Sequence, residues 1–138
     1  MKINFIGRVI DQIETKLGKA IALCTVADER KARDIVALDV SPLTTIADTF
    51  IICTCENSIH IRTLMNEIEL KAKNELGCYL RREGTPETNW VVLSDKDIVC
   101  HLMDQGLREY YDLEGIWHEA PNLPWEIKEE HPKQSAVK

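Results

Sequence analysis

Two apolar runs in the second half of the chain, Trp90-Val-Val-Leu93 and Ile98-Val-Cys-His-Leu-Met103, are separated only by the polar segment Ser94-Asp-Lys-Asp97. β-Branched runs that flank a short segment of Asp and Ser residues are typical of a β-hairpin. If Leu93 pairs with Ile98, Trp90 lies opposite His101, and side chains alternate between the two faces of the sheet. One face is then wholly apolar. The other holds Trp90, Val92, Val99, His101 and Met103, and we expect either an interface or a surface covered by the chain after Gly106.

The other strands and the helices follow from the spacing of apolar residues. Residues 34–40 and 49–54 are apolar at consecutive positions, which is typical of strands covered on both faces. Apolar residues at three- and four-residue steps predict a long helix between a cap at Asn57 or Ser58 and a stop at Gly77. Similar spacing predicts helices over 3–17 and 20–31, a short strand over 79–83 and a closing helix over 105–113. The expected fold class is α/β (α+β): a single mixed sheet of about five strands with helices mainly on one face.

Composition narrows the classes of function. The 138 residues fit one domain, and 17 basic against 23 acidic residues give a net charge of −6. This balance favours basic partners and predicts little or no direct binding of nucleic acid. The five cysteines lack CxxC spacing, and the chain shows neither a long apolar run nor a signal peptide. We therefore expect a reduced, cytoplasmic protein that does not associate with membranes.

Carboxylates offer the main enzymatic alternative. Asp95 and Asp97 would share one face of a strand and, with Asp39, could hold Mg²⁺ and a nucleotide phosphate. Within a hairpin turn, however, Asp is simply a favoured turn residue, and no glycine-rich phosphate loop accompanies these positions. The sequence shows no assembled catalytic constellation and no set of spaced metal ligands.

Several segments, in order and with matching spacing, resemble the ribosomal silencing factor (Iojap) family over residues 20–119. They are Ala32-Arg-Asp-Ile-Val-Ala-Leu-Asp-Val40, Ile46-Ala-Asp-Thr-Phe-Ile-Ile-Cys-Thr54, Arg82-Glu-Gly84, Trp90 with His101, and Arg108-Glu-Tyr-Tyr-Asp-Leu-Glu-Gly-Ile-Trp117. The chain departs from the family pattern in Thr54-Cys-Glu-Asn-Ser58, at Ile59, and in the turn Ser94-Asp-Lys-Asp97.

The resemblance implies a nucleotidyltransferase-like core without catalytic residues, cofactor or metal. It implies a protein that docks on the large ribosomal subunit, on the ribosomal protein numbered fourteen. There it would sterically prevent the small subunit from joining and so repress translation under nutrient limitation. The expected contacts are Trp90, Val92, Val99, His101 and Met103, with Glu83, Asp95 and Asp97 as an acidic rim and Tyr110 and Tyr111 as further candidates.

The expected organisation is an N-terminal helical extension (1–19), a silencing-factor domain (20–119) and a flexible C-terminal tail (120–138). Two alternatives stay open. One is a metal-dependent nucleotidyltransferase-like enzyme that uses Asp39, Asp95 or Asp97. The other is a homodimer in which the face that carries Trp90 and His101 pairs with a second copy of the chain.

Overall fold

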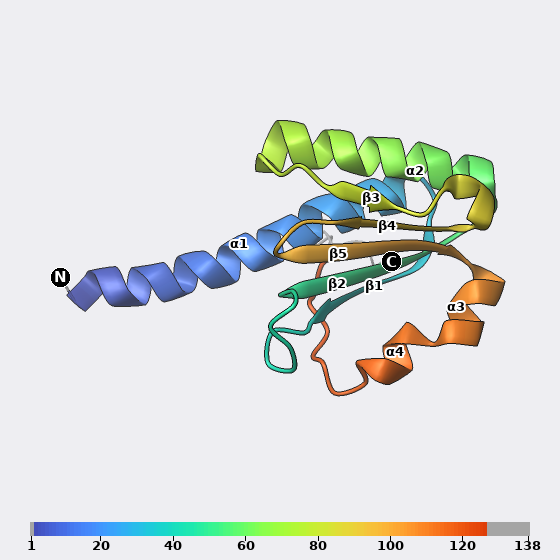
Figure 1. The fold of residues 1–138 in the computed structure, drawn as a ribbon. Helices are drawn as coiled ribbons and strands as arrows, with labels where there is room; N and C mark the ends of the chain where they lie inside the picture. The colour runs from blue at the N-terminus through green and yellow to red at the C-terminus, as the bar shows by residue number, and fades with distance from the viewer. Residues whose placement is uncertain (1, 127–138) are drawn as a thin grey trace, which may run out of the picture.

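A five-stranded mixed sheet with the strand order β1-β2-β5-β4-β3 organises the chain (Figure 1). The computed structural model describes residues 2–126, with side chains from residue 15 onward. The strands are β1 (Arg33–Asp39), β2 (Thr49–Cys55), β3 (Arg81–Glu83), β4 (Trp90–Ser94) and β5 (Ile98–Asp104). β2 and β5 are parallel, and the other neighbours are antiparallel. The predicted fold class is confirmed.

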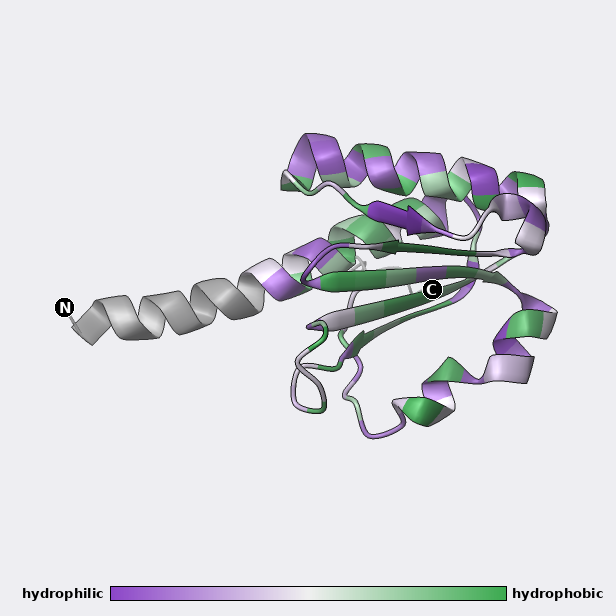
Figure 2. Ribbon diagram, in the orientation of Figure 1, coloured by the Kyte–Doolittle hydropathy of each residue, from purple (hydrophilic) through white to green (hydrophobic). Residues whose placement is uncertain are grey.

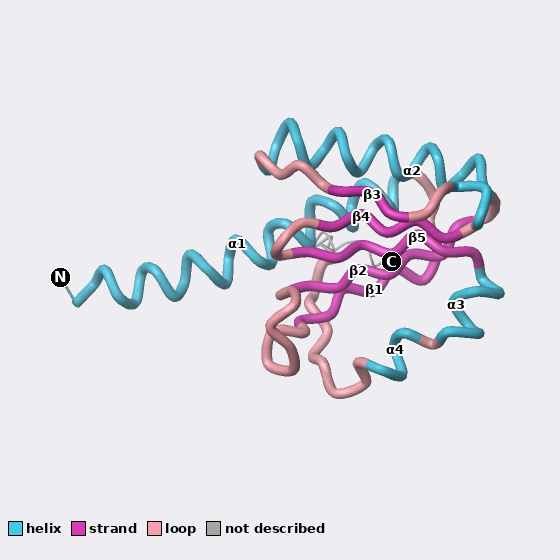
Figure 3. The backbone as a smooth tube through the Cα atoms, viewed as in Figure 1, coloured by secondary structure: helices cyan, strands magenta, loops and turns pink. Residues whose placement is uncertain are grey.

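Helices cover the two sides of the sheet unequally. α1 (Lys2–Glu29) and α2 (Ser58–Lys71), which continues into a π-helical turn (Ala72–Leu76), pack on one face. The short helices α3 (Gln105–Tyr111) and α4 (Leu113–Ile116) lie on the other side (Figures 1 and 3), and a 3₁₀ turn (Pro86–Thr88) precedes β4. The helices are thus mainly on one face, as predicted.

The main core lies between the sheet and the two long helices. Its apolar side chains include Leu23 and Cys24 of α1, Leu64 and Ile68 of α2, Ile51 and Cys53 of β2, Val91 and Leu93 of β4, and Cys100 and Leu102 of β5. In Figure 2, β4, which contributes to this core, is hydrophobic, whereas the edge strand β3 is hydrophilic. The buried cysteines act as small apolar residues, as the sequence predicted.

α1 is one continuous helix, so the prediction of two helices separated at Gly18 is wrong. The apolar stripes on both sides of Gly18 are in phase, and a Cβ at this position would meet nothing within 4 Å. A single glycine inside a helix costs only about 1 kcal/mol relative to alanine, which is too little to end it. The continuous helix crosses the expected boundary between residues 19 and 20, and its N-terminal half projects away from the sheet (Figure 1).

The predicted hairpin exists, but its register differs by two residues. Trp90 pairs with Met103 and Val92 pairs with His101, whereas we expected Trp90 opposite His101. The turn explains the difference, because Ser94 extends β4 and pairs with Val99 at the start of the ladder. An even shift leaves every side chain on its original face. The two faces therefore have the predicted composition, and only the partners within each face change.

The first part of the expected flexible tail is ordered, which corrects that prediction for residues 121–126. The N–H of Asp39 donates to the carbonyl of Pro121 (2.8 Å), and the N–H of Leu123 donates to the carbonyl of Ala37 (2.8 Å). The indole of Trp125 donates to the carbonyl of Ile35 (3.2 Å). This segment, residues 121–125, covers the outer edge of β1, and we call it the C-terminal strap. The rest of the expected tail, 127–138, lies outside the described residues.

Candidate functional site

The face of the sheet opposite α1 and α2 carries the predicted contact residues. Alternating positions of β4 and β5 place Trp90, Val92, Val99, His101 and Met103 on it, together with Phe50 of the neighbouring β2. Trp90, Val92, Val99 and Phe50 are half-buried, whereas only 8% of His101 is exposed. Chain after Gly106 covers part of this face, and the remainder is open. The covering by the chain after Gly106 is thus seen for part of the face, and an interface on the open part stays a prediction.

Met103 is on the covered part and is fully buried. A residue without accessible surface cannot contact a partner in this structure, so the prediction that Met103 is a contact residue is wrong. The cause is α3, which follows β5 directly and folds back over this end of the strand.

Aromatic rings form a continuous row across the open part. The ring centroids of Trp117 and Phe50 are 5.1 Å apart, those of Phe50 and His101 5.4 Å, and those of His101 and Trp90 5.9 Å. Tyr111 of α3 extends the row, with its ring 4.9 Å from that of Trp90. Offset and tilted ring pairs at these separations are favourable beyond the burial of their area. The row ties α3 and the segment after α4 to the sheet and holds the indole of Trp90 in place.

His101 has an unusual hydrogen-bonding state. Its Nδ1 accepts a hydrogen bond from the Trp90 indole N–H (3.1 Å), which leaves the ring proton on Nε2. Nε2 is buried and has no hydrogen-bond partner among the described residues. Burial lowers the pKa of His101 to about 4, so the imidazole is neutral at pH 7. His101 therefore orients Trp90 as a neutral acceptor rather than as a charged group.

A shallow depression borders Trp90. It has a volume of about 480 Å³ and is lined by Glu83, Gly84, Trp90, Val92, Leu107 and Tyr111. Gly84 has a φ of +81°, and a Cβ there would lie 2.4 Å from the carbonyl oxygen of Trp90. Only glycine therefore allows β3 to approach β4 this closely. Glu83, which pairs with Val92, and the exposed Tyr110 lie on accessible surface, so these predicted contact residues are available to a partner.

Asp95 and Asp97 do not border this depression. They lie in the hairpin turn, at the end of β4 opposite to Trp90. The carboxylate of Asp95 accepts hydrogen bonds from the N–H groups of Asp97 (2.8 Å) and Ile98 (2.9 Å), and Asp97 forms an ion pair with Lys19 of α1 (3.4 Å). Asp95 thus shapes the turn and Asp97 anchors α1, and their role as an acidic rim stays a prediction that this depression does not support.

The same geometry bears on the enzymatic alternative. Asp39 pairs with Lys16 (3.3 Å) and accepts hydrogen bonds from Ser41. Burial alone would raise the pKa of Asp39, but the bonds from Ser41 and Lys16 hold it below its ordinary value. Within the part of the chain that the structure describes, no group of three His, Cys, Asp or Glu residues could hold a metal ion.

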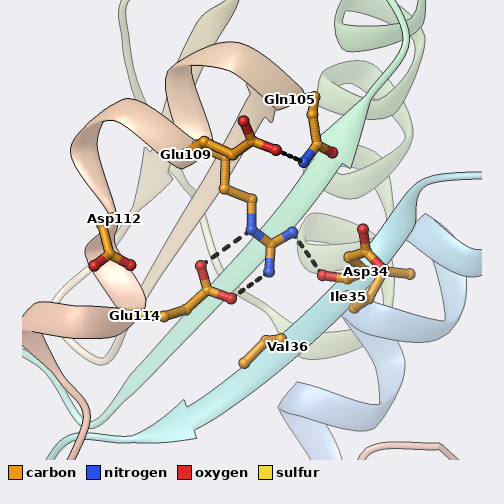
Figure 4. Close-up of a pocket in the computed structure, with 8 residues that line it drawn as sticks. Asp34, Ile35, Val36, Gln105, Glu109, Asp112 and Glu114 are labelled. Atoms are coloured by element: carbon orange, nitrogen blue, oxygen red, sulfur yellow. Dashed lines mark hydrogen bonds and ion pairs between the residues drawn. The ribbon is translucent and has the colours of Figure 1, made fainter.

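Arg108 of α3 was missed by the sequence analysis. Its guanidinium is buried and donates to both carboxylate oxygens of Glu114 (3.2 and 2.7 Å) and to the carbonyl of Asp34 (2.6 Å) (Figure 4). It also donates to the hydroxyl of Thr54 (2.8 Å). It links α3, α4, β1 and β2. The signal that could have found it is its place at the start of the segment 108–117, which carries part of the family resemblance.

Comparisons with known proteins agree with the earlier resemblance. Residues 13–138 match the family described as "Ribosomal silencing factor during starvation". The chain is 35% identical over 103 residues to ribosomal silencing factor RsfS of Bacillus subtilis (strain 168), covering 74% of this chain and 84% of that protein. It is 28% identical over 99 residues to "Mitochondrial assembly of ribosomal large subunit protein 1" of Mus musculus, covering 69% of this chain and 43% of the mouse protein. A crystal structure of a Chromobacterium violaceum protein superposes with a TM-score of 0.69 and 29% identity, over 73% of this chain and 84% of that one.

None of the described helices combines the length and the hydropathy that a bilayer span requires.

Proposed function

Because this chain belongs to the ribosomal silencing factor family, we propose that it binds the large ribosomal subunit through the ribosomal protein numbered fourteen and blocks joining of the small subunit. The block is steric, and it represses translation under nutrient limitation. No chemical step is needed, so the proposed activity is not enzymatic and requires no cofactor. The name of the mouse relative, which refers to assembly of the large ribosomal subunit, supports the choice of that particle.

The observation that carries the proposal is the half-buried Trp90 beside the depression on the open face of the sheet. Tryptophan and tyrosine next to a hollow are the residue types that dominate binding energy at protein interfaces. We propose Trp90, Val92 and Val99 as the contact centre, with His101 holding Trp90 from below. Tyr110, which is 79% exposed, Tyr111 and Glu83 complete the surface.

The charge of the chain supports a protein partner. A net charge of −6 steers the protein toward a basic surface and away from exposed phosphate. We therefore propose contact with a ribosomal protein and little or no contact with ribosomal RNA, in the cytoplasm. No observation favours the nucleotidyltransferase alternative, because Asp39 and Asp97 are paired with lysines and Asp95 shapes a turn. Pairing of two copies through the same face stays open and would compete with the ribosome.

Co-sedimentation with purified large subunits, small subunits and assembled ribosomes tests the proposal. We expect binding to large subunits alone, with fewer assembled ribosomes formed afterwards. Trp90→Ala should weaken this binding by about 2 kcal/mol or more, because it removes the aromatic anchor. Val92→Lys tests the same surface without touching the Trp90–His101 hydrogen bond.

Tyr79→Ala is the matched control, because Tyr79 is an exposed aromatic residue (76%) that does not line the depression. Circular dichroism verifies that each variant is folded. Wild-type affinity in folded Trp90→Ala and Val92→Lys would refute the contact surface, and no binding of the wild-type protein to any ribosomal particle would refute the proposed function.

A further inference from the structure

A second depression lies on the same side of the sheet, separated from Trp90 by the segment that runs from α3 to the strap. Two adjoining hollows of about 460 and about 320 Å³ form it, and both are lined by Val36 and Glu114. In the first hollow, β1 supplies one wall and α3 and α4 supply the other (Figure 4). Residues that follow α4 line the second hollow. We call this depression the β1 groove. Its floor is apolar, with Val36 in both hollows and Leu38 and Trp117 in the second.

The first hollow of the β1 groove is strongly negative. Asp34, Glu109 and Asp112 line the first hollow besides Glu114, and all are accessible or partly accessible. Arg108 is the only cationic residue among the lining residues of that hollow, and Glu114 already neutralises it through two hydrogen bonds. The accessible charge is therefore that of the carboxylates at the rim, which attract cations and repel phosphate.

We propose that the β1 groove binds an extended protein segment in which apolar residues alternate with lysine or arginine. The apolar residues would lie on Val36, while the basic side chains would reach the carboxylates of Asp34 and Glu109 at the rim. Alternation follows from the extended conformation, because successive side chains of such a segment point to opposite sides. This inference rests on the proposed function for the source of the segment, which we take to be a ribosomal protein of the large subunit.

Other occupants fit less well. RNA would bring phosphate to a rim of carboxylates. A metal ion would need a group of ligands that the described residues do not provide. A second copy of this chain carries the same net charge of −6, so its approach to an acidic groove would be repulsive over most of its surface.

Nuclear magnetic resonance titration of the full chain with a short peptide of alternating lysine and valine tests the inference directly. We expect the largest shifts at the amides of Val36 and Glu114 and a loss of affinity at high salt. The variant Asp34→Asn/Glu109→Gln should bind about fivefold more weakly at low salt, since each exposed ion pair contributes modestly. Asparagine is chosen at position 34 because Asp34 has a φ of 51°, which asparagine also tolerates.

The matched control is Asp28→Asn/Glu29→Gln, which removes the same number of charges from exposed positions of α1 that line neither hollow. A peptide of alternating glutamate and valine serves as the second control and should not bind. Equal weakening by the two double variants, or shifts centred on Trp90 instead of Val36, would overturn the inference.

Co-sedimentation separates this inference from the proposed function. Weaker large-subunit binding of Asp34→Asn/Glu109→Gln than of the α1 control supports the groove as a second contact. Wild-type binding of both double variants, with Trp90→Ala impaired, leaves the proposed function intact and refutes the groove. If the wild-type protein binds neither the peptide nor any ribosomal particle, both the groove inference and the proposed function are refuted.

Discussion

Replacing Arg108 with methionine should destabilise the protein far more than removing an exposed arginine. Methionine retains the apolar length of the side chain and removes the guanidinium. Four hydrogen bonds are then lost, two to Glu114 and one each to the Asp34 carbonyl and the Thr54 hydroxyl. These bonds join α3 and α4 to the first two strands of the sheet. Arg108 thus holds this segment to the sheet together with the row of aromatic rings.

The magnitude follows from the burial of each partner. Thr54 is fully buried, so its hydroxyl cannot be hydrated again, and a buried polar group left without a partner costs about 1–3 kcal/mol. The side chain of Glu114 is 38% exposed, so water replaces part of its loss, and we discount that contribution to about 1 kcal/mol. We expect Arg108→Met to lower the free energy of unfolding by about 2–4 kcal/mol, a large part of the stability of a typical domain.

Urea unfolding followed by circular dichroism measures this change. Arg62→Met is the matched control, because Arg62 also pairs with a single glutamate, Glu87, but both side chains are more than half exposed. The control should change the free energy of unfolding by less than about 1 kcal/mol. If the two variants lose the same free energy of unfolding, burial does not make the hydrogen bonds of Arg108 more stabilising than an exposed ion pair.

Three further predictions concern other features. Gly84→Ala should lower the free energy of unfolding by about 2 kcal/mol or more, because Gly84 has a positive φ and an added Cβ would clash with a carbonyl oxygen. Gly18→Ala should instead raise the free energy of unfolding by about 1 kcal/mol, and equal melting temperatures of the two variants would contradict both expectations. The pKa of His101 is lowered from 6.5 to about 4, so the neutral ring stabilises the fold fully above pH 6.5 and this contribution is lost as the pH falls toward 4. The difference in stability between the wild type and His101→Gln should shrink by about 2 kcal/mol between pH 7 and pH 5 in urea titrations, and a constant difference would refute the assignment. A chain that ends at residue 120 should exchange the outward-facing amides of β1 with deuterium faster than a chain that ends at residue 126; equal rates would show that the strap does not protect that edge.

The sequence predicted those parts of the fold that depend on local periodicity. The strands 34–40 and 49–54 match β1 and β2 within one residue, and α2 begins after its Asn57 cap and ends before Gly77 as expected. The faces of the hairpin were also predicted, because the alternation of side chains does not depend on which residue lies opposite. The register did depend on the turn, and the turn is set by two hydrogen bonds to one carboxylate, that of Asp95.

The remaining features depend on contacts between residues far apart in the sequence. The burial of Met103 results from the direction in which α3 leaves β5, and the hydrogen bonds of Arg108 join positions 54 and 74 residues away. The composition of the strap predicted a flexible tail, because the backbone groups of β1 that bind the strap lie more than eighty residues earlier in the chain. Asp39 and Asp97 form ion pairs with Lys16 and Lys19 of α1, whereas the sequence had offered both carboxylates as candidate ligands of a metal ion. A local sequence pattern does not reveal contacts between residues so far apart, so only the folded chain could show which carboxylates form ion pairs with lysines.

Both edges of the sheet are protected against pairing with a further strand, by different means. At one margin the strap occupies backbone groups of β1, and its own two prolines, Pro121 and Pro124, lack the N–H that a further strand would need. At the other margin β3 has only three residues, Arg81, Arg82 and Glu83, all charged and exposed. Intermolecular sheet extension, the usual route from an open β-sheet to aggregates, is therefore disfavoured at both ends. The protein can present a wide apolar face to a partner while the strands that support it stay unable to polymerise.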